Sequence, residues 1–394
     1  MERFVHNKAA GFTVKFQEDS RQAKRGSLEE LNRIAPLLFN ATGNSARASG
    51  PSPTRLARTK PDARLAKHRT PALLEVGPYH GGPTARISRI ESNGTRTTVI
   101  GNLPSGTSAL PSGDTEGVAD VAFVNGQLYA LLAGGGCSHG NPGVPNAVIR
   151  INRQQGTAEM VANLSQFFRN HPVAHPNNGP TGDFEADGTP YHMRPFRGDL
   201  LVMEPNHGRL LRINLTRWRD PKIEQLTDVS APLGHIVPTS IAFRDNRFYV
   251  GNLGQFPITV GAEKLYQITH DGFVIDYWGG FTTVLDVRVD DHGRLYVLEF
   301  SSAAGFPAPG NGRILRITGK LVEEIVTGLS VPTAMVLDHH GDIYVSDLGA
   351  APAGAGRILR FDNPVSGTVI SNIEVRKPAP LGDGDHDGDD RDEH

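Results

Sequence analysis

Val331-Pro-Thr-Ala-Met-Val-Leu337, with Asp342-Ile-Tyr-Val-Ser-Asp347 and Arg357-Ile-Leu-Arg-Phe361 after it, is the last of three copies of one pattern in this 394-residue chain. The earlier copies begin at Val237 and Thr283. Their second runs are centred on tyrosines that mark a period of about 47 residues, namely Tyr249, Tyr296 and Tyr344. A fixed period in this range, built from short β-type runs, is typical of propeller blades.

The third run of the pattern extends the count beyond these three copies. Strands of the Arg-Ile-Leu-Arg-Ile type end at six places along the chain, namely Ile90, Ile151, Ile213, Ile268, Ile317 and Phe361. A four-stranded blade is too small to bury both of its faces alone, whereas a closed ring buries them and leaves short, protected edges. We therefore predict an all-β fold, a six-bladed β-propeller over residues 73–376.

The first blade and the two ends of the chain fit this pattern less well. The first blade has no recognisable inner pair of strands. Either residues 1–72 supply a degenerate pair, for which Gly11–Phe16 is the candidate, or the ring is incomplete. Residues 1–72 are otherwise expected to form a disordered or non-native leader, and residues 377–394 an acidic disordered tail.

Composition excludes several classes of protein. The single Cys137 excludes an intrachain disulfide and any multi-cysteine zinc site. There is no run of about 18 apolar residues that could span a membrane, and the N-terminus as written has no signal-peptide h-region. The net charge is −2, and the basic excess is confined to residues 1–70, so nucleic-acid binding by the propeller is not supported. We expect a monomer.

Polar residues recur at two equivalent positions of the repeat. These positions are the start of the innermost strand and the end of the second strand, which open at the same mouth of the central channel, where the loops of all blades converge. From the second blade onward, the first position holds Asp120, His192, Ser240, Asp286 and Ala334. The second position holds Glu204, Asn252, Glu299 and Asp347. Apart from Ala334, we predict that these residues bind a small molecule or a protein partner at the mouth.

Two interpretations of these residues stay open. In the functional one, Asp120, Asp286 and Glu299 are oxygen ligands of a hard divalent cation such as Ca²⁺, which could polarise a carbonyl or activate water. In the structural one, the acidic side chains cap strand ends and accept hydrogen bonds from loop amides. Separate blades place the groups many ångströms apart, so only some of them could share one ion.

Two weaker signals lie in the loops. The loop Val173–Pro190 and its flanks carry many polar side chains and could cover the mouth, although loop polarity alone also explains them; they are His171, His175, Asp183, Glu185, Asp187 and His192. Cys137 and His139 lie two residues apart after a run of glycines. Nothing local would lower the pKa of the thiol, so a nucleophilic pair is not favoured.

The order of the motifs is similar to that of a known family. The motifs are Val118–Phe123, Val237–Phe243, Tyr249–Pro257, Gly280–Asp286, Leu295–Glu299 and Val331–Met335. Together they resemble the ScyD/ScyE family, bacterial proteins named for the scytonemin biosynthesis cluster, over roughly Gly82 to Phe361. The resemblance implies an NHL-like β-propeller, exported to the periplasm or outside the cell, with no established catalysis. It transfers no catalytic residues, and residues 1–72 match neither the family's signal peptide nor its first inner strands.

A second family resemblance offers the alternative function. Gluconolactonase and strictosidine-synthase relatives are similar in architecture, and such lactonases use Glu, Asn and Asp around Ca²⁺. The repeat places Asp120 and Asp286 near the matching part of the strand, but without the Asn-Gly and Asp-Gly signatures expected there. The alternative is therefore a Ca²⁺-dependent hydrolase of the lactonase type.

Overall fold

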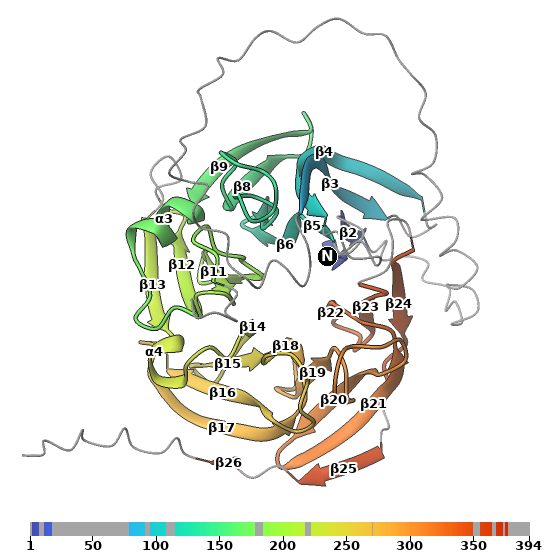
Figure 1. The fold of residues 1–394 in the computed structure, drawn as a ribbon. Helices are drawn as coiled ribbons and strands as arrows, with labels where there is room; N and C mark the ends of the chain where they lie inside the picture. Colours follow the sequence, from blue (N-terminus) through green and yellow to red (C-terminus); the bar gives the residue numbers. More distant parts are fainter. Residues whose placement is uncertain are drawn as a thin grey trace, which may run out of the picture.

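Six β-sheets stand around a central axis, which confirms the predicted six-bladed β-propeller (Figure 1). The structure is a computed structural model. It describes residues 2–7, 12–17, 79–90, 95–107, 115–177, 184–216, 222–269, 271–349, 355–364, 368–372 and 375–376. Apart from two strands near the N-terminus, the predicted leader (1–72) and tail (377–394) lie outside the described residues.

Blades two to five share one pattern, a four-stranded antiparallel meander whose strands follow chain order from the axis outward. Blade two consists of β6 (Val118–Val124), β7 (Gln127–Leu132), β8 (Ala147–Asn152) and β9 (Thr157–Asn163). Blade three consists of β10 (His192–Phe196), β11 (Asp199–Glu204), β12 (Arg209–Asn214) and β13 (Lys222–Asp228). Blade four consists of β14 (Pro238–Arg244), β15 (Arg247–Asn252), β16 (Glu263–Thr269) and β17 (Val274–Phe281). Blade five consists of β18 (Val284–Val289), β19 (Leu295–Glu299), β20 (Gly312–Thr318) and β21 (Leu321–Leu329).

Blade one resolves the alternative left open by the sequence. It contains β1 (Glu2–Asn7), β2 (Phe12–Gln17), β3 (His80–Ile90), β4 (Arg96–Thr107) and β5 (Thr115–Glu116). The candidate segment Gly11–Phe16 thus lies largely within β2, and β1 and β2 supply the inner pair. Unlike the inner pairs of the other blades, this one enters the sheet with β2 parallel to β3.

Among the described residues, blade six has three strands and no fourth. Blade six contains β22 (Ala334–Leu337), β23 (Ile343–Asp347) and β24 (Arg357–Phe361). The next strand, β25 (Thr368–Asn372), pairs with β21 of blade five, and β26 (Val375–Arg376) pairs with β17 of blade four. The end of the described chain therefore runs around the outside of two blades rather than completing its own.

The hydrophobic core lies between neighbouring blades. Tyr249 of blade four is buried in one cluster with Val287 and Leu295 of blade five, and its ring stacks on Trp278 with centroids 5.3 Å apart. Burying such an aromatic side chain contributes about 1.5–3 kcal/mol. This is why the Leu-Tyr pairs recur with the period of the blades.

Two short helices lie in connections between blades. In α3 (Leu164–Asn170), the Asn163 side chain caps the N-terminus by accepting a hydrogen bond from the Gln166 amide at 2.9 Å. The second helix, α4 (Ser230–Leu233), follows β13. Neither helix has the length and apolar character needed to cross a bilayer, and the described residues contain no other such segment.

Candidate functional site

A β-bulge at the start of the innermost strands orients the predicted residues. The register between the innermost and second strands shifts by one residue just before Asp120, Ser240 and Asp286. Bulges of this kind bend a strand and re-aim its side chains. Asp120 and Asp286 line the axial cavity together with their preceding neighbours, Ala119 and Leu285, whereas Ser240 is not part of the lining.

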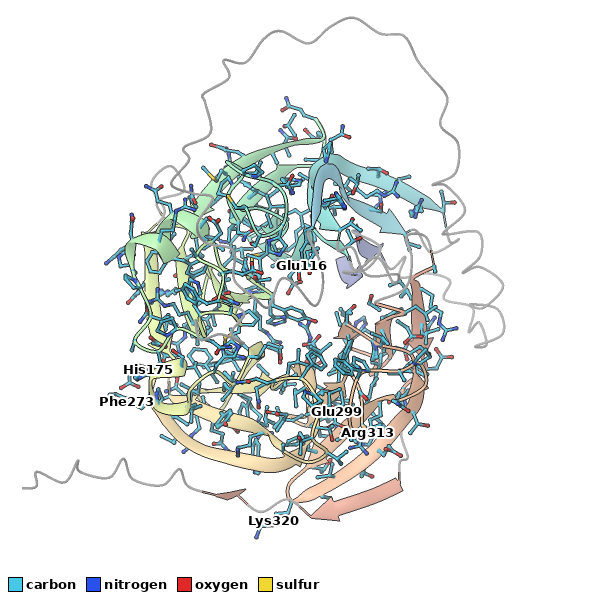
Figure 2. All side chains as sticks on the ribbon, viewed as in Figure 1. Glu116, His175, Phe273, Glu299, Arg313 and Lys320 are labelled. Atoms are coloured by element: carbon cyan, nitrogen blue, oxygen red, sulfur yellow. The ribbon has the colours of Figure 1, made fainter. Side chains whose placement is uncertain are left out.

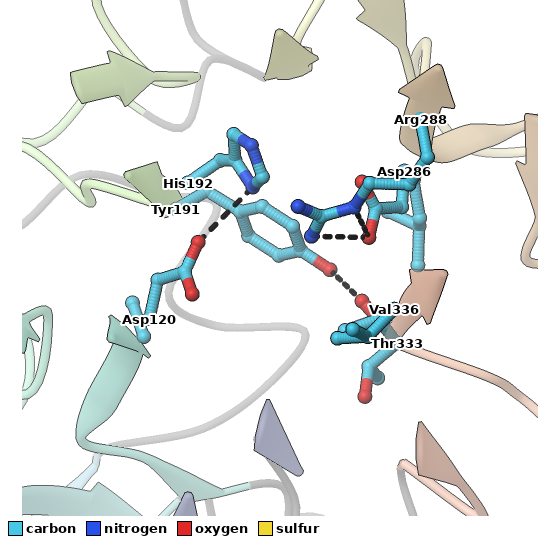
Figure 3. A pocket seen from close by; sticks show the side chains of 10 residues that line it. Asp120, Tyr191, His192, Asp286, Arg288, Thr333 and Val336 are labelled. Carbon is cyan, nitrogen blue, oxygen red and sulfur yellow. Dashed lines mark hydrogen bonds and ion pairs between the residues drawn. The ribbon is translucent and has the colours of Figure 1, made fainter. Parts of the chain in front are cut away.

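The cavity on the axis is small and lined by both polar and apolar residues. Its volume is about 20 Å³, enough for one or two water molecules or for the end group of a larger ligand. Figure 3 shows the side chains around it. The residues that contribute polar side chains or a polar backbone atom are Asp120, Tyr191, His192, Asp286, Arg288 and Thr333.

Asp120 joins the innermost strands of blades two and three. Its Oδ2 lies 3.1 Å from Nδ1 of His192 and accepts a hydrogen bond from the Met193 amide at 2.9 Å. Burial alone would raise the pKa of this carboxyl. The hydrogen bond and charge of His192, together with the charge of Arg288, outweigh burial and lower the pKa below its usual value. The ionised Asp120 side chain therefore connects blade two to blade three.

Asp286 repeats this arrangement between blades five and six. Its Oδ2 accepts a hydrogen bond from the Met335 amide at 3.0 Å and from Nη2 of Arg288 at 2.8 Å. Met335 and Met193 are equivalent, because they directly follow Ala334 and His192, which occupy the same position of the repeat. The repetition of the contact supports the structural interpretation for one oxygen of each aspartate.

Tyr191 lies across the channel. Its hydroxyl donates a hydrogen bond to the Thr333 carbonyl oxygen at 2.9 Å, which links blade three to blade six on the opposite side of the ring. Burial, followed by the charges of Asp286 and Asp120, raises the pKa of Tyr191 well above its usual value, so the hydroxyl remains a donor. The sequence did not reveal this residue, because it precedes the strand and its partner is 142 residues away.

Three predicted residues each keep one buried polar atom without a hydrogen-bond partner within the described part of the chain. The atoms are Nε2 of His192, Oγ of Ser240 and Oδ1 of Asp286. They belong to the same position of blades three, four and five. We call these three residues the axial arc. Other buried atoms of this kind occur in the described residues, such as Nδ1 of His207 and Oγ of Ser88, but these three share one position of the repeat. Water or a ligand commonly supplies the missing bond to such atoms.

The acids at the ends of the second strands are fully engaged elsewhere. Glu299 is completely buried and accepts hydrogen bonds from the Thr282 amide at 2.6 Å and from Nε of Arg313 (Figure 2). Asp347 is bound in the same way by the Ser330 amide at 2.6 Å and by Nε of Arg357 at 2.8 Å. Each acid fastens the loop before the innermost strand to the third strand of its own blade.

The two remaining residues of this set have related roles. Glu204 accepts hydrogen bonds from the amides of Thr189 and His207, both at 2.7 Å. Asn252 donates to the Ile236 carbonyl at 3.2 Å and accepts from the Lys264 amide at 3.0 Å. None of the four residues at the ends of the second strands lines the axial cavity. The structural interpretation therefore accounts for their contacts.

The predicted metal ligands do not form one donor set. Among the described residues, no three His, Cys, Asp or Glu side chains come together as a metal site. Both oxygens of Glu299 are occupied, and the guanidinium of Arg288 already supplies positive charge to Asp286. The arrangement of Asp120, Asp286 and Glu299 therefore does not fit a shared Ca²⁺ ion.

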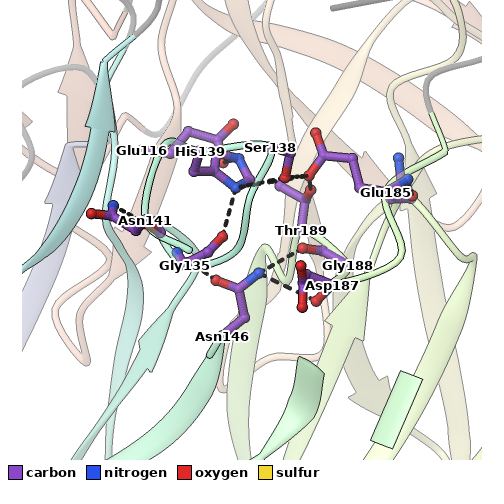
Figure 4. Close-up of polar contacts among 12 residues, drawn as sticks. Glu116, Gly135, Ser138, His139, Asn141, Asn146, Glu185, Asp187, Gly188 and Thr189 are labelled. Carbon is purple, nitrogen blue, oxygen red and sulfur yellow. Dashed lines mark hydrogen bonds and ion pairs between the residues drawn. The ribbon is translucent and has the colours of Figure 1, made fainter. Parts of the chain in front are cut away.

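A second polar cluster surrounds His139 and was not anticipated as a unit (Figure 4). The buried ring has Nδ1 at 2.9 Å from the Gly135 carbonyl oxygen and Nε2 at 2.9 Å from the Glu116 carboxylate. Glu185 lies 3.8 Å from Nδ1 and accepts a hydrogen bond from Ser138 at 2.7 Å. Burial lowers the pKa of His139, but Glu185, Glu116 and the Gly135 carbonyl oxygen raise it to about 10 overall. The imidazolium of His139 thus connects Glu116, its own loop at Gly135, and Glu185.

Fold and site together define the class of protein, a six-bladed β-propeller with a small axial cavity lined by both polar and apolar residues. No family model matches the chain, and no curated protein matches it either. Similar solved structures include a gluconolactonase from Xanthomonas campestris, with a TM-score of 0.44 and 11% identity over 74% of this chain and 79% of that one. A virginiamycin B lyase from Staphylococcus aureus has a TM-score of 0.35 and 16% identity, over 67% and 89% of the two chains. A luciferin-regenerating enzyme has a TM-score of 0.41 and 11% identity, over 68% and 87%. Similarity at this level carries no argument about activity.

Proposed function

We propose that this protein is a ligand-binding β-propeller whose axial arc holds a polar group of a small molecule. The observation that carries the proposal is the set of three unsatisfied atoms, on His192, Ser240 and Asp286. Leaving such an atom buried without a bond costs about 1–3 kcal/mol. His192 and Asp286 line the axial cavity, and Ser240 occupies the equivalent position of the blade between theirs, so the first two offer the direct partners for a bound group.

The chemistry of the arc defines what it takes. Oδ1 of Asp286 is an acceptor, so the ligand presents a donor, whereas the Ser240 hydroxyl can donate or accept. The cavity admits a group about the size of a water molecule. A ligand hydroxyl meets all three conditions. The competing Ca²⁺-dependent hydrolase receives no support from the donor set at the axis, because Arg288 supplies the positive charge there.

The resemblance of the motifs to the ScyD/ScyE family belongs to this proposal as well. On that basis the protein is an exported bacterial propeller that acts as a monomer and binds its ligand without catalysis. Sequencing upstream of Met1 tests export directly. An in-frame signal peptide supports it, and an upstream stop codon with no apolar segment before Met1 contradicts it.

The methionines provide the test of binding. The chain has five, of which Met193 and Met335 follow the axial positions and are buried, whereas Met160 is 53% exposed on β9. With ¹³C-methyl methionine, titration of ethylene glycol, the smallest diol, is expected to shift the Met193 and Met335 signals saturably and to leave Met160 unchanged. Ser240→Ala should weaken the response. Equal, non-saturating shifts at all methionines would show that the diol acts as a solvent and not at the arc.

A further inference from the structure

One arginine on the channel wall has no carboxylate partner among the described residues. Arg194 follows His192 by two positions on β10, so its side chain lies on the same face of the strand, roughly 6.6 Å further along it. Its Nη1 donates a hydrogen bond to the Ile241 carbonyl oxygen at 2.7 Å. The side chain is half-buried.

The equivalent residue of blade five shows what is missing. Arg288 follows Asp286 by two positions on β18 and pairs with that carboxylate at 2.8 Å. Blade three has the guanidinium but places His192 where blade five has the acid. Arg194 therefore has no acid at the position that gives Arg288 its partner.

The electrostatics of the channel favour an anion beside Arg194. Burial and the nearby charge of Arg288 lower the pKa of Arg194 to about 10, although Asp286 and Asp120 act in the opposite direction. The guanidinium is still charged at neutral pH. A partly desolvated cation without a counter-ion is unfavourable, and the planar fork of arginine suits a carboxylate.

We infer that the ligand of the axial arc is a hydroxy carboxylate whose carboxylate pairs with Arg194 while its hydroxyl bonds to the arc. This inference rests on the proposed function, because it names the chemical class of ligand for the same site. The carboxylate takes the place that Asp286 fills for Arg288. The hydroxyl supplies the donor that Oδ1 of Asp286 lacks.

A matched pair of probes tests the inference. Glycolate and ethylene glycol share one hydroxymethyl group and differ in having a carboxylate or a second hydroxyl. At constant ionic strength, methionine-methyl titration of the wild-type protein is expected to give at least about tenfold tighter binding of glycolate, as a charge-assisted hydrogen bond would produce. Arg194→Gln should abolish that preference and leave ethylene glycol binding unchanged. Arg197→Gln, an arginine of the same hairpin, is the control and should behave as the wild type.

The outcomes separate the two proposals. Equal affinity for both probes, unchanged in Arg194→Gln, would overturn the carboxylate inference and leave hydroxyl binding by the arc intact. Absence of saturable binding for both probes would overturn both. If Arg194→Gln does not fold because the bond to Ile241 is lost, Arg194→Lys replaces it. That variant keeps the charge without the fork, and the inference expects it to bind glycolate more weakly than the wild type does.

Discussion

Raising the pH from 6.5 to 10 is expected to destabilise this protein through His139. The pKa of this residue is raised from 6.5 to about 10 in the folded state by Glu185 and Glu116, despite the opposing effect of burial. A folded-state pKa above the unfolded one gives a contribution that is fully present below pH 6.5. It is lost as the pH rises through about 10, where the folded-state group deprotonates.

The size of the stability loss depends on the one proton that His139 releases and on the solvent exposure of Glu116 and Glu185. A single uncoupled group loses about 1.4 kcal/mol per pH unit across such a window. Glu116 and Glu185 have side chains that are 21% and 15% exposed, so solvent screens part of their attraction. We therefore expect deprotonation of His139 to lower the free energy of unfolding by about 2–3 kcal/mol in total, which is less than the loss per pH unit multiplied by the whole pH range.

Urea unfolding at fixed pH values between 6 and 10, followed by intrinsic fluorescence, measures this loss. His139→Gln should be less stable than the wild type at the acidic end, and the difference should shrink towards pH 10. His292→Gln changes an exposed histidine and should leave the curve parallel to that of the wild type. Parallel curves for His139→Gln and the wild type over the whole range would refute the assignment of a raised pKa.

Three other outcomes follow from the contacts. Glu299→Ala should lower the free energy of unfolding by about 3–5 kcal/mol, because the partly buried Arg313 loses the acid that binds its Nε. Glu324→Ala removes the more exposed partner of the same arginine and should lower the free energy of unfolding by less than about 1 kcal/mol. Equal losses in the two variants would contradict this prediction. Val237→Asn should raise the unfolding free energy by roughly 1 kcal/mol, because a β-branched residue at φ 55° is strained and asparagine tolerates that region; a lower urea midpoint would contradict it. Millimolar Ca²⁺ should leave the thermal midpoint unchanged, and a saturable rise that Asp286→Asn abolishes would restore the metal site.

The local repeat was enough to predict the ring. Tyr249 and Tyr296 are buried in clusters that join neighbouring blades, and Tyr344 continues their spacing at a half-buried position. The spacing of a single strand pair therefore reports the whole architecture. The same alignment identified Asp120, His192, Ser240 and Asp286 as equivalent, and the pairing of the innermost with the second strand places them at the same register position of their blades. Which residues occupy equivalent positions of the repeat can therefore be determined from the sequence alone.

The partners of those residues depended on closing the ring. Whether an acid at a strand end faces a ligand, a loop amide or an arginine is decided by which segments the fold brings against it. Asp120 accepts a hydrogen bond from the Met193 amide of the next blade, and Tyr191 bonds to Thr333 across the axis, through contacts that no spacing encodes. Periodicity is set by hydrogen bonds and packing within one blade. The chemistry of the mouth arises between blades, where distant parts of the chain meet, and the tertiary structure alone brings them together.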